Sequence, residues 1–119
     1  MTEKISHKIP KTAVLDVAKR VIDIEASALT ALKSKLGDSF IEAVELILAT
    51  EGKVVITGMG KSGLICQKIA STFASTGTSA FFLHPAEGAH GDLGVLSKDD
   101  ILIAVSNSGE SEEIVTTLP

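Results

Sequence analysis

A short β-branched run that ends at a glycine-rich loop and continues as a helical pattern is the feature that most constrains the fold of this chain. Residues 53–57 read Lys-Val-Val-Ile-Thr, and residues 58–63 read Gly-Met-Gly-Lys-Ser-Gly. From 62 to 75 the apolar residues recur at helical spacing, and two further apolar runs follow at 79–83 and 101–105. Strands that alternate with helices predict an α/β fold with a parallel sheet covered on both faces.

Two helices are predicted ahead of the first strand. The first spans about 12–36, where apolar residues recur every three or four positions, and Gly37 is expected at its C′ position. The second follows at once, because Ser39 and Glu42 have the spacing of a capping box, and Gly52 is expected to end it. The apolar stripe of the first helix consists of Val14, Val17, Val21, Ile24, Ala28, Leu32 and Leu36.

Charge and composition exclude several classes of partner. The net charge is −4, and the chain has four Phe but no Trp or Tyr, which leaves neither a basic field nor stacking platforms for nucleic acid. One cysteine cannot form a disulfide framework, and no apolar run approaches the roughly 20 residues of a membrane helix. The N-terminus lacks the apolar segment of a signal peptide. We therefore expect a cytoplasmic protein that recognises a small molecule.

The glycine loop fits two known phosphate-binding motifs only in part. Gly58, Gly60 and Gly63 match the dinucleotide fingerprint, but that motif needs an acidic residue at the end of the next strand, where the chain reads Phe-Leu-His. The P-loop motif needs a glycine where the chain has Val55. Glycines at a helix start can still bind an anion through backbone N–H groups. The alternative is that they only allow close packing between strand and helix.

A second loop of similar composition follows the third strand. Ser106, Ser108 and Ser111 surround Gly109 just before a further predicted helix. This composition is common in turns and N-caps, but hydroxyl and N–H groups at a helix start also suit a phosphate monoester. Because the carboxyl ends of parallel strands lie at one edge of a sheet, both loops are expected beside the same ligand.

Charged residues in these loops are candidates for chemistry. Lys61 is the cation of the two loops, and it is either a solvated surface lysine or a group that neutralises a phosphate or enediolate oxygen. Three carboxylates open the last predicted helix, where they pair favourably with the helix dipole. One of them is a candidate for a catalytic role, and the three are Glu110, Glu112 and Glu113.

Two histidines lie between the second and third strands. His84 and His90 flank Glu87, with Asp92 close by, and such a set could ligate zinc. The spacing fits no closed structural zinc pattern. A histidine that lines the pocket as a proton carrier or hydroxyl partner is the favoured interpretation. Cys66 falls inside a helix and is expected to be a small packed residue.

Four ordered segments, 52–63, 72–78, 84–94 and 106–114, together resemble the SIS (sugar isomerase) domain family, and within it the arabinose-5-phosphate isomerases. The second segment reads Thr-Phe-Ala-Ser-Thr-Gly-Thr, and the last begins Ser-Asn-Ser-Gly-Glu-Ser. The resemblance implies a flavodoxin-like, five-stranded parallel sheet. It implies interconversion of D-ribulose 5-phosphate and D-arabinose 5-phosphate, for Kdo and lipopolysaccharide synthesis. It also implies a homotetramer that needs no cofactor and that zinc can inhibit.

The same resemblance assigns roles to single residues. Lys61, Glu113 and His90 match family residues tied to catalysis or substrate contact. Isomerisation through an enediolate needs a base for the carbon acid, a proton carrier for the oxygens, and positive charge on the enediolate. We assign the acid/base role to Glu113 and the positive charge to Lys61. His90 is expected to contact sugar hydroxyls, and His84 matches a candidate ligand of inhibitory zinc. The expected substrate-binding set is Gly60, Ser62, Gly77, Thr78, His90, Ser106, Ser108, Ser111, Thr116 and Thr117.

Length is where the chain departs from the family pattern. Residues 1–51 are expected to form an N-terminal helical segment, and residues 52–119 the first half of the SIS core, with three of five strands and no CBS domain. We expect this stretch alone to be catalytically inactive. The alternative function is a non-catalytic SIS module that senses a sugar phosphate. A phosphoheptose isomerase and a Rossmann oxidoreductase are weaker alternatives.

Overall fold

The computed structural model describes residues 9–86, 92–109 and 112. The chain divides into two compact units, Met1–Ile41 and Glu42–Pro119. The predicted boundary, after residue 51, lies ten residues later than this division. The final part of the second predicted helix therefore belongs to the same unit as the strands.

The first unit contains one long helix, α1 (Lys11–Leu32), which continues as a 3-10 turn, η1 (Lys33–Lys35). The predicted helix at 12–36 is confirmed over most of its length. No residue of α1 is buried, so its apolar stripe is exposed along the whole helix. In the part of the chain that the structure describes, no helix is both long and apolar enough to cross a lipid bilayer.

The second helix, α2 (Asp38–Ala49), begins earlier and ends earlier than predicted. Gly37 is not a left-handed C′ residue of the first helix. Its carbonyl instead accepts the first backbone hydrogen bonds of α2, from Phe40 N (3.0 Å) and Ile41 N (3.3 Å). The capping-box prediction is wrong, because Ser39 lies inside the helix. Gly52 does not end α2 either; it lies in the link to the first strand.

Three parallel strands form the sheet of the second unit, which confirms the predicted α/β class. They are β1 (Val54–Gly58), β2 (Ala80–Phe82) and β3 (Ile101–Val105), in the order β2-β1-β3. All five residues of the middle strand, β1, are buried, as its unbroken β-branched run predicts. β3 matches the predicted strand residue for residue, whereas β2 is two residues shorter than its predicted run.

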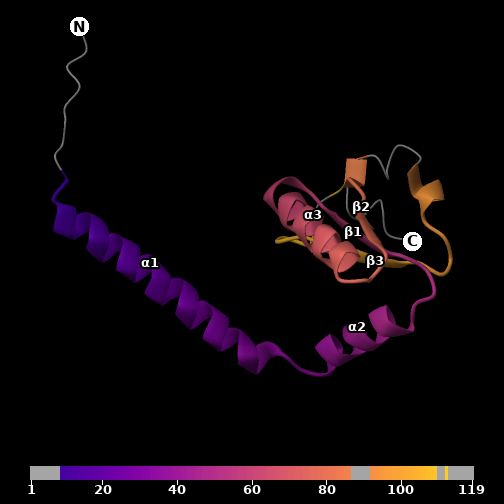
Figure 1. Cartoon of the computed structure of the whole chain (residues 1–119), viewed down its shortest axis with the longest axis horizontal. Coiled ribbons are helices and arrows are strands. Elements are labelled where there is room, and N and C mark those ends of the chain that lie inside the picture. The colour runs from indigo at the N-terminus through magenta and orange to yellow at the C-terminus, as the bar shows by residue number, and fades with distance from the viewer. Residues whose placement is uncertain (1–8, 87–91, 110–111, 113–119) are drawn as a thin grey trace, which may run out of the picture. The chain divides into compact units, whose positions relative to one another are not determined.

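Helix α3 (Gly60–Ser75) covers one face of this sheet (Figure 1). Its residues Cys66 and Ala70 form the core cluster together with Val54 and Ile56 of β1. Each of these four side chains is at most 4% exposed. The helix starts two residues earlier than predicted, so its first turn includes part of the glycine loop.

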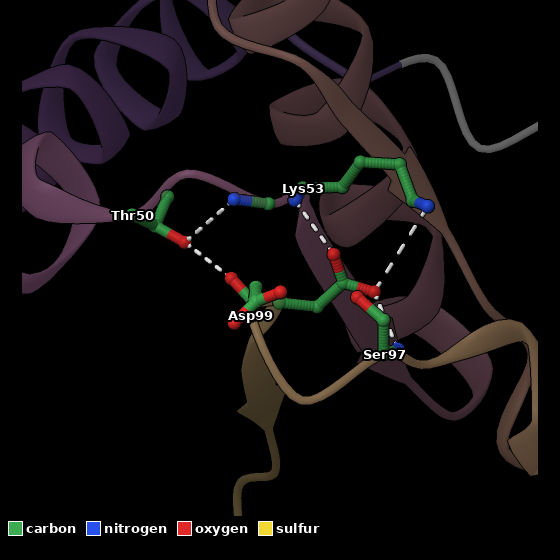
Figure 2. Close-up of polar contacts among 6 residues, drawn as sticks. Thr50, Lys53, Ser97 and Asp99 are labelled. Atoms are coloured by element: carbon green, nitrogen blue, oxygen red, sulfur yellow. Dashed lines mark hydrogen bonds and ion pairs between the residues drawn. The ribbon is translucent and has the colours of Figure 1, made fainter.

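A hydrogen-bonded network ties the amino ends of β1 and β3 together (Figure 2). The Asp100 carboxylate accepts the backbone N–H groups of Lys53 (2.7 Å) and Ser97 (2.8 Å), and the Lys53 Nζ lies 4.0 Å from it. These two N–H bonds to the charged form lower the pKa of Asp100. Thr50 Oγ1 donates to the Asp99 carbonyl at 2.7 Å. The network fixes the register of the two strands at the edge opposite their carboxyl ends.

Candidate functional site

The carboxyl ends of β1, β2 and β3 lie at one edge of the sheet because the strands are parallel. After β1 the chain moves outward to β2 and then returns past β1 to form β3, so the direction of strand addition reverses between β1 and β3. In open α/β sheets, ligands bind outside the carboxyl ends of the strands at such a reversal. Gly58 of β1 pairs with Val105 of β3, and the two candidate loops therefore start side by side.

Two of the three loop glycines serve close packing. A Cβ at Gly58 would stand 2.9 Å from Cys66 Sγ and 3.1 Å from the Val105 carbonyl oxygen. A Cβ at Gly63 would stand 2.5 Å from the Gly58 carbonyl oxygen. At these two positions the packing interpretation is confirmed, since only glycine lets α3 approach β1 and β3 this closely.

The third loop glycine, Gly60, serves a different purpose. Its φ of +57° is left-handed, and a Cβ there would meet nothing within 4 Å. Gly60 also begins α3, whose N-terminus has no side-chain cap. The first turn thus presents backbone N–H groups and the positive end of the helix dipole, beside the exposed Lys61 and the half-buried Ser62. This arrangement suits an anion.

The loop after β3 folds into a tight turn beside this helix start. Gly109 has a φ of +71°, and its N–H donates to Ser106 Oγ at 2.9 Å. Ser106 is half-buried and Ser108 is exposed. The structure therefore places Ser106 and Ser108 at the same edge as Gly60, Lys61 and Ser62, as the sequence predicts for the two loops.

His84 follows β2 at the same edge. The Leu83 N–H donates to the Ile56 carbonyl at 2.9 Å and thereby extends the pairing with β1 up to the residue before His84. The imidazole packs edge-to-face against Phe82, with ring centroids 6.4 Å apart. Its Nδ1 accepts the Ala86 N–H at 3.1 Å. Two independent contacts thus hold the ring.

A buried threonine and cysteine lie directly beneath the glycine loop. Thr57 is fully buried, and its Oγ1 has no hydrogen-bond partner among the described residues. Cys66 is a packed residue, as predicted, and its Sγ donates to the Thr57 carbonyl at 3.4 Å. Burial raises the pKa of the Cys66 thiol, which keeps it protonated. The β-branched run predicts only a strand position for Thr57; its hydroxyl among aliphatic neighbours is the signal that sets it apart.

Gly77 and Thr78 lie away from the two loops. Gly77 has a φ of +101°, and Thr78 N–H donates to the Phe73 carbonyl at 2.9 Å, which together end α3 in a Schellman motif. Helix α3 runs antiparallel to the strands, so this cap lies at the amino edge of the sheet. Within the described part of one chain, the predicted substrate-binding pair is not brought to the candidate site.

Several predicted site residues lie outside the described residues, and their roles stay predictions. Within residues 9–86, 92–109 and 112, no group of three or more His, Cys, Asp or Glu side chains could hold a metal ion. The predicted site residues outside these ranges are His90, Ser111, Glu113, Thr116 and Thr117.

Known proteins resemble this chain over most of its length. The sequence matches the family model of the SIS domain over residues 47–119. The arabinose 5-phosphate isomerase KdsD of Pseudomonas aeruginosa is 55% identical over 102 residues, which are 86% of this chain and 31% of that protein. The protein of the same name from Francisella tularensis is 48% identical over 115 residues, 94% of this chain and 35% of that protein.

Solved structures show the same likeness. A protein of E. coli CFT073, solved in complex with arabinose 5-phosphate, has a TM-score of 0.86 and 42% identity to this chain. The match covers 93% of this chain and 59% of that one. The chain spans about a third of the length of the curated relatives it matches.

Proposed function

Since this chain belongs to the SIS domain family, we propose that it carries the substrate-binding edge of an aldose–ketose isomerase. The reaction is the interconversion of D-ribulose 5-phosphate and D-arabinose 5-phosphate. Relatives that are named arabinose 5-phosphate isomerase, at 48% to 55% identity, support this choice of reaction. The solved relative in complex with arabinose 5-phosphate supports a sugar phosphate as the ligand.

The observation that carries the proposal is the juxtaposition of two anion-suited loops at the β1–β3 reversal. The uncapped start of α3 offers N–H groups around Gly60, and the β3 loop offers the hydroxyls of Ser106 and Ser108. N–H and hydroxyl donors bind a phosphate without a basic protein surface, which agrees with a net charge of −4. Lys61, in the same first turn, adds one positive charge.

The chemistry needs three things in addition to the phosphate site: a base for the carbon acid, a proton carrier for the oxygens, and positive charge on the enediolate. The base removes a proton from one of the carbons C1 and C2, the resulting cis-enediolate is reprotonated at the other, and the carrier moves a proton from the hydroxyl oxygen to the former carbonyl oxygen. Glu113 is the residue that we assign to this proton transfer. Lys61 stabilises the enediolate oxygen, and His90 contacts the sugar hydroxyls. No cofactor takes part in this scheme, because the proton leaves and returns without any change of oxidation state in the enzyme.

The test compares two lysines on the same helix in the full-length protein. Lys61→Met removes the cation of the first turn of α3, whereas Lys68→Met removes an exposed lysine two turns further on. Loss of one group that stabilises an oxyanion lowers kcat by about 10²–10³-fold. We expect that loss for Lys61→Met and less than a twofold change for Lys68→Met, with arabinose 5-phosphate as substrate.

The outcomes of this test separate the candidate functions. Equal rates for Lys61→Met and the wild type would remove Lys61 from the mechanism. Binding of arabinose 5-phosphate without turnover by the wild-type protein would favour the sensor module. Glu113→Gln with near-normal turnover would remove Glu113 from the proton transfer.

The remaining features of the proposal concern assembly and location. We expect a cytoplasmic homotetramer with no required cofactor. The apolar stripe of α1 supports association between chains, because Val14, Val17 and Ile24 are each more than half exposed. Light scattering on the full-length protein measures the oligomeric state, and a monomer would contradict this part of the proposal.

A further inference from the structure

His84 is held on the candidate edge by contacts that reach back to α3. Its ring packs edge-to-face on Phe82. The Phe82 ring in turn lies beside Gly63, since its Cζ is 3.6 Å from the point where a Gly63 Cβ would stand. His84 is half-buried. The imidazole is therefore a fixed group beside the first turns of α3, not a freely rotating surface side chain.

The hydrogen bond from Ala86 determines which ring nitrogen carries the proton. The Ala86 N–H donates to His84 Nδ1 at 3.1 Å, so Nδ1 must offer a lone pair. A neutral imidazole has one N–H and one lone pair. The proton of neutral His84 is therefore on Nε2. Among the residues that the structure describes, no hydrogen bond uses this N–H, so it is the donor that the side chain can offer a ligand.

This arrangement does not suit a zinc ligand. Zinc binds a ring nitrogen through its lone pair, and in this ring the Nδ1 lone pair is already occupied by the Ala86 N–H. Coordination through Nε2 would move the proton to Nδ1, where it would face the Ala86 N–H as a second donor. In zinc sites the other ring N–H normally donates to a carboxylate, a carbonyl oxygen or water. At the corresponding position, Nδ1 of His84 instead faces a hydrogen-bond donor, the Ala86 N–H.

We infer that His84 is a hydrogen-bond donor through Nε2–H to an oxygen of the sugar phosphate, and that it does not ligate zinc. The ligand part of this inference rests on the proposed function, whereas the tautomer and the zinc part do not. Phosphate and hydroxyl oxygens of a sugar phosphate are acceptors, and a donor held by two contacts meets them with little loss of side-chain freedom. His84 is thus a binding residue that supplements the two loops.

The tautomer is read directly by nitrogen NMR on the full-length protein with ¹⁵N-labelled histidine. The His84 signals are identified by their absence in His84→Gln. We expect the long-range ¹H–¹⁵N correlation pattern of the Nε2–H form, and the Nδ1–H pattern would overturn the inference. Zinc affinity is measured by calorimetry after chelator treatment. It should be the same in the wild type and in His84→Gln, and the absence of measurable zinc binding in both proteins would also meet this expectation. Loss of zinc binding in His84→Gln alone would also overturn it.

Substrate kinetics test the ligand part. The Gln amide nitrogen stands close to the position of His Nε2 and donates similarly, whereas Leu fills the space without a donor. His84→Leu should raise KM for arabinose 5-phosphate by about tenfold or more, and His84→Gln should recover most of that loss. Equal KM values for His84→Leu and the wild type would overturn the ligand part. If the wild-type protein has no isomerase activity, the proposed function fails, but the NMR and zinc measurements still decide the other part.

Discussion

Replacement of Gly63 by alanine tests the packing role of the glycine loop. The new Cβ would lie 2.5 Å from the Gly58 carbonyl oxygen and 3.3 Å from its carbon. Both atoms belong to the backbone of β1, which is buried along its whole length and cannot move aside as a flexible side chain would. Overpacking of this kind costs about 1–3 kcal/mol, and the better helix propensity of alanine offsets up to about 1 kcal/mol of it. Because the clash is with backbone atoms, the cost is expected at the upper end, about 3 kcal/mol, which leaves a net loss of about 2 kcal/mol at this position.

The same substitution at Gly60 tests a different cost. Nothing lies within 4 Å of a Gly60 Cβ, so there is no clash. The cost comes from the φ of +57°, since an L-residue in left-handed conformation loses about 1–2 kcal/mol, partly offset by lower entropy of the unfolded chain. Asparagine tolerates this conformation better than alanine. Gly60→Asn should therefore be more stable than Gly60→Ala. At Gly63 the order should be reversed, with Gly63→Ala more stable than Gly63→Asn, because the larger side chain clashes more.

Hydrogen exchange on the full-length protein measures these effects locally. The free energy of opening is compared for peptides that cover β1 and α3 in the four variants. Gly94→Ala is the control, because a Cβ there meets nothing within 4 Å and its φ is not left-handed. We expect it to be neutral or slightly stabilising. If the Asn and Ala variants ranked in the same order of stability at both positions, the costs at Gly60 and Gly63 would not differ in kind, and the reasoning would be refuted.

Two further predictions concern polar groups around the sheet. Thr57→Val replaces a buried hydroxyl without a partner among the described residues by a methyl group, and should stabilise the protein by about 1 kcal/mol in urea unfolding; destabilisation would show that the hydroxyl is bonded. Asp100→Asn sets an amide NH₂ against one of the N–H groups of Lys53 and Ser97, and should speed hydrogen exchange at the starts of β1 and β3. Because folding lowers the pKa of Asp100, its stabilisation is present above the ordinary value of 3.8 and is lost as the pH falls through the lower folded value. The difference in hydrogen-exchange rate between Asp100→Asn and the wild type should therefore shrink below that pH range. A difference independent of pH would contradict a stabilising role of the charged Asp100 carboxylate.

The strands and the main helices were predictable because their signals are local. The β-branched run of β1 and the helical spacing of the apolar residues in α3 each act within a few residues. Gly77 takes a φ of +101° as a C′ glycine should. The two candidate loops were also predictable, since a parallel topology places them at one edge.

Other features depended on contacts that the sequence does not display. Ser39 and Glu42 have capping-box spacing, but α2 begins one residue earlier, after Gly37. Gly52 was expected to end a helix, yet a Cβ there would overlap the Asp99 carbonyl, 47 residues further along the chain. The tautomer of His84 likewise follows from one backbone N–H that no spacing rule identifies. In each case a specific neighbour, not the residue type, decides the role.

The glycine motif alone does not identify the ligand. Gly58 and Gly63 are required because a strand and a helix approach closely, and any α/β protein with this approach needs small residues there, whatever it binds. Gly60 is required by its left-handed φ and leaves the space in front of the helix start open, which suits any anion.

The choice between a dinucleotide and a sugar phosphate must come from the neighbouring strands. The end of β2 carries His84, a donor, where a dinucleotide site needs a carboxylate to accept from the ribose hydroxyls. The end of β3 adds the hydroxyls of Ser106 and Ser108, to which the proposed function assigns the phosphate. A site made of donors on all three strands is complementary to a small ligand rich in acceptor oxygens, and that complementarity, more than the glycines, supports a sugar phosphate.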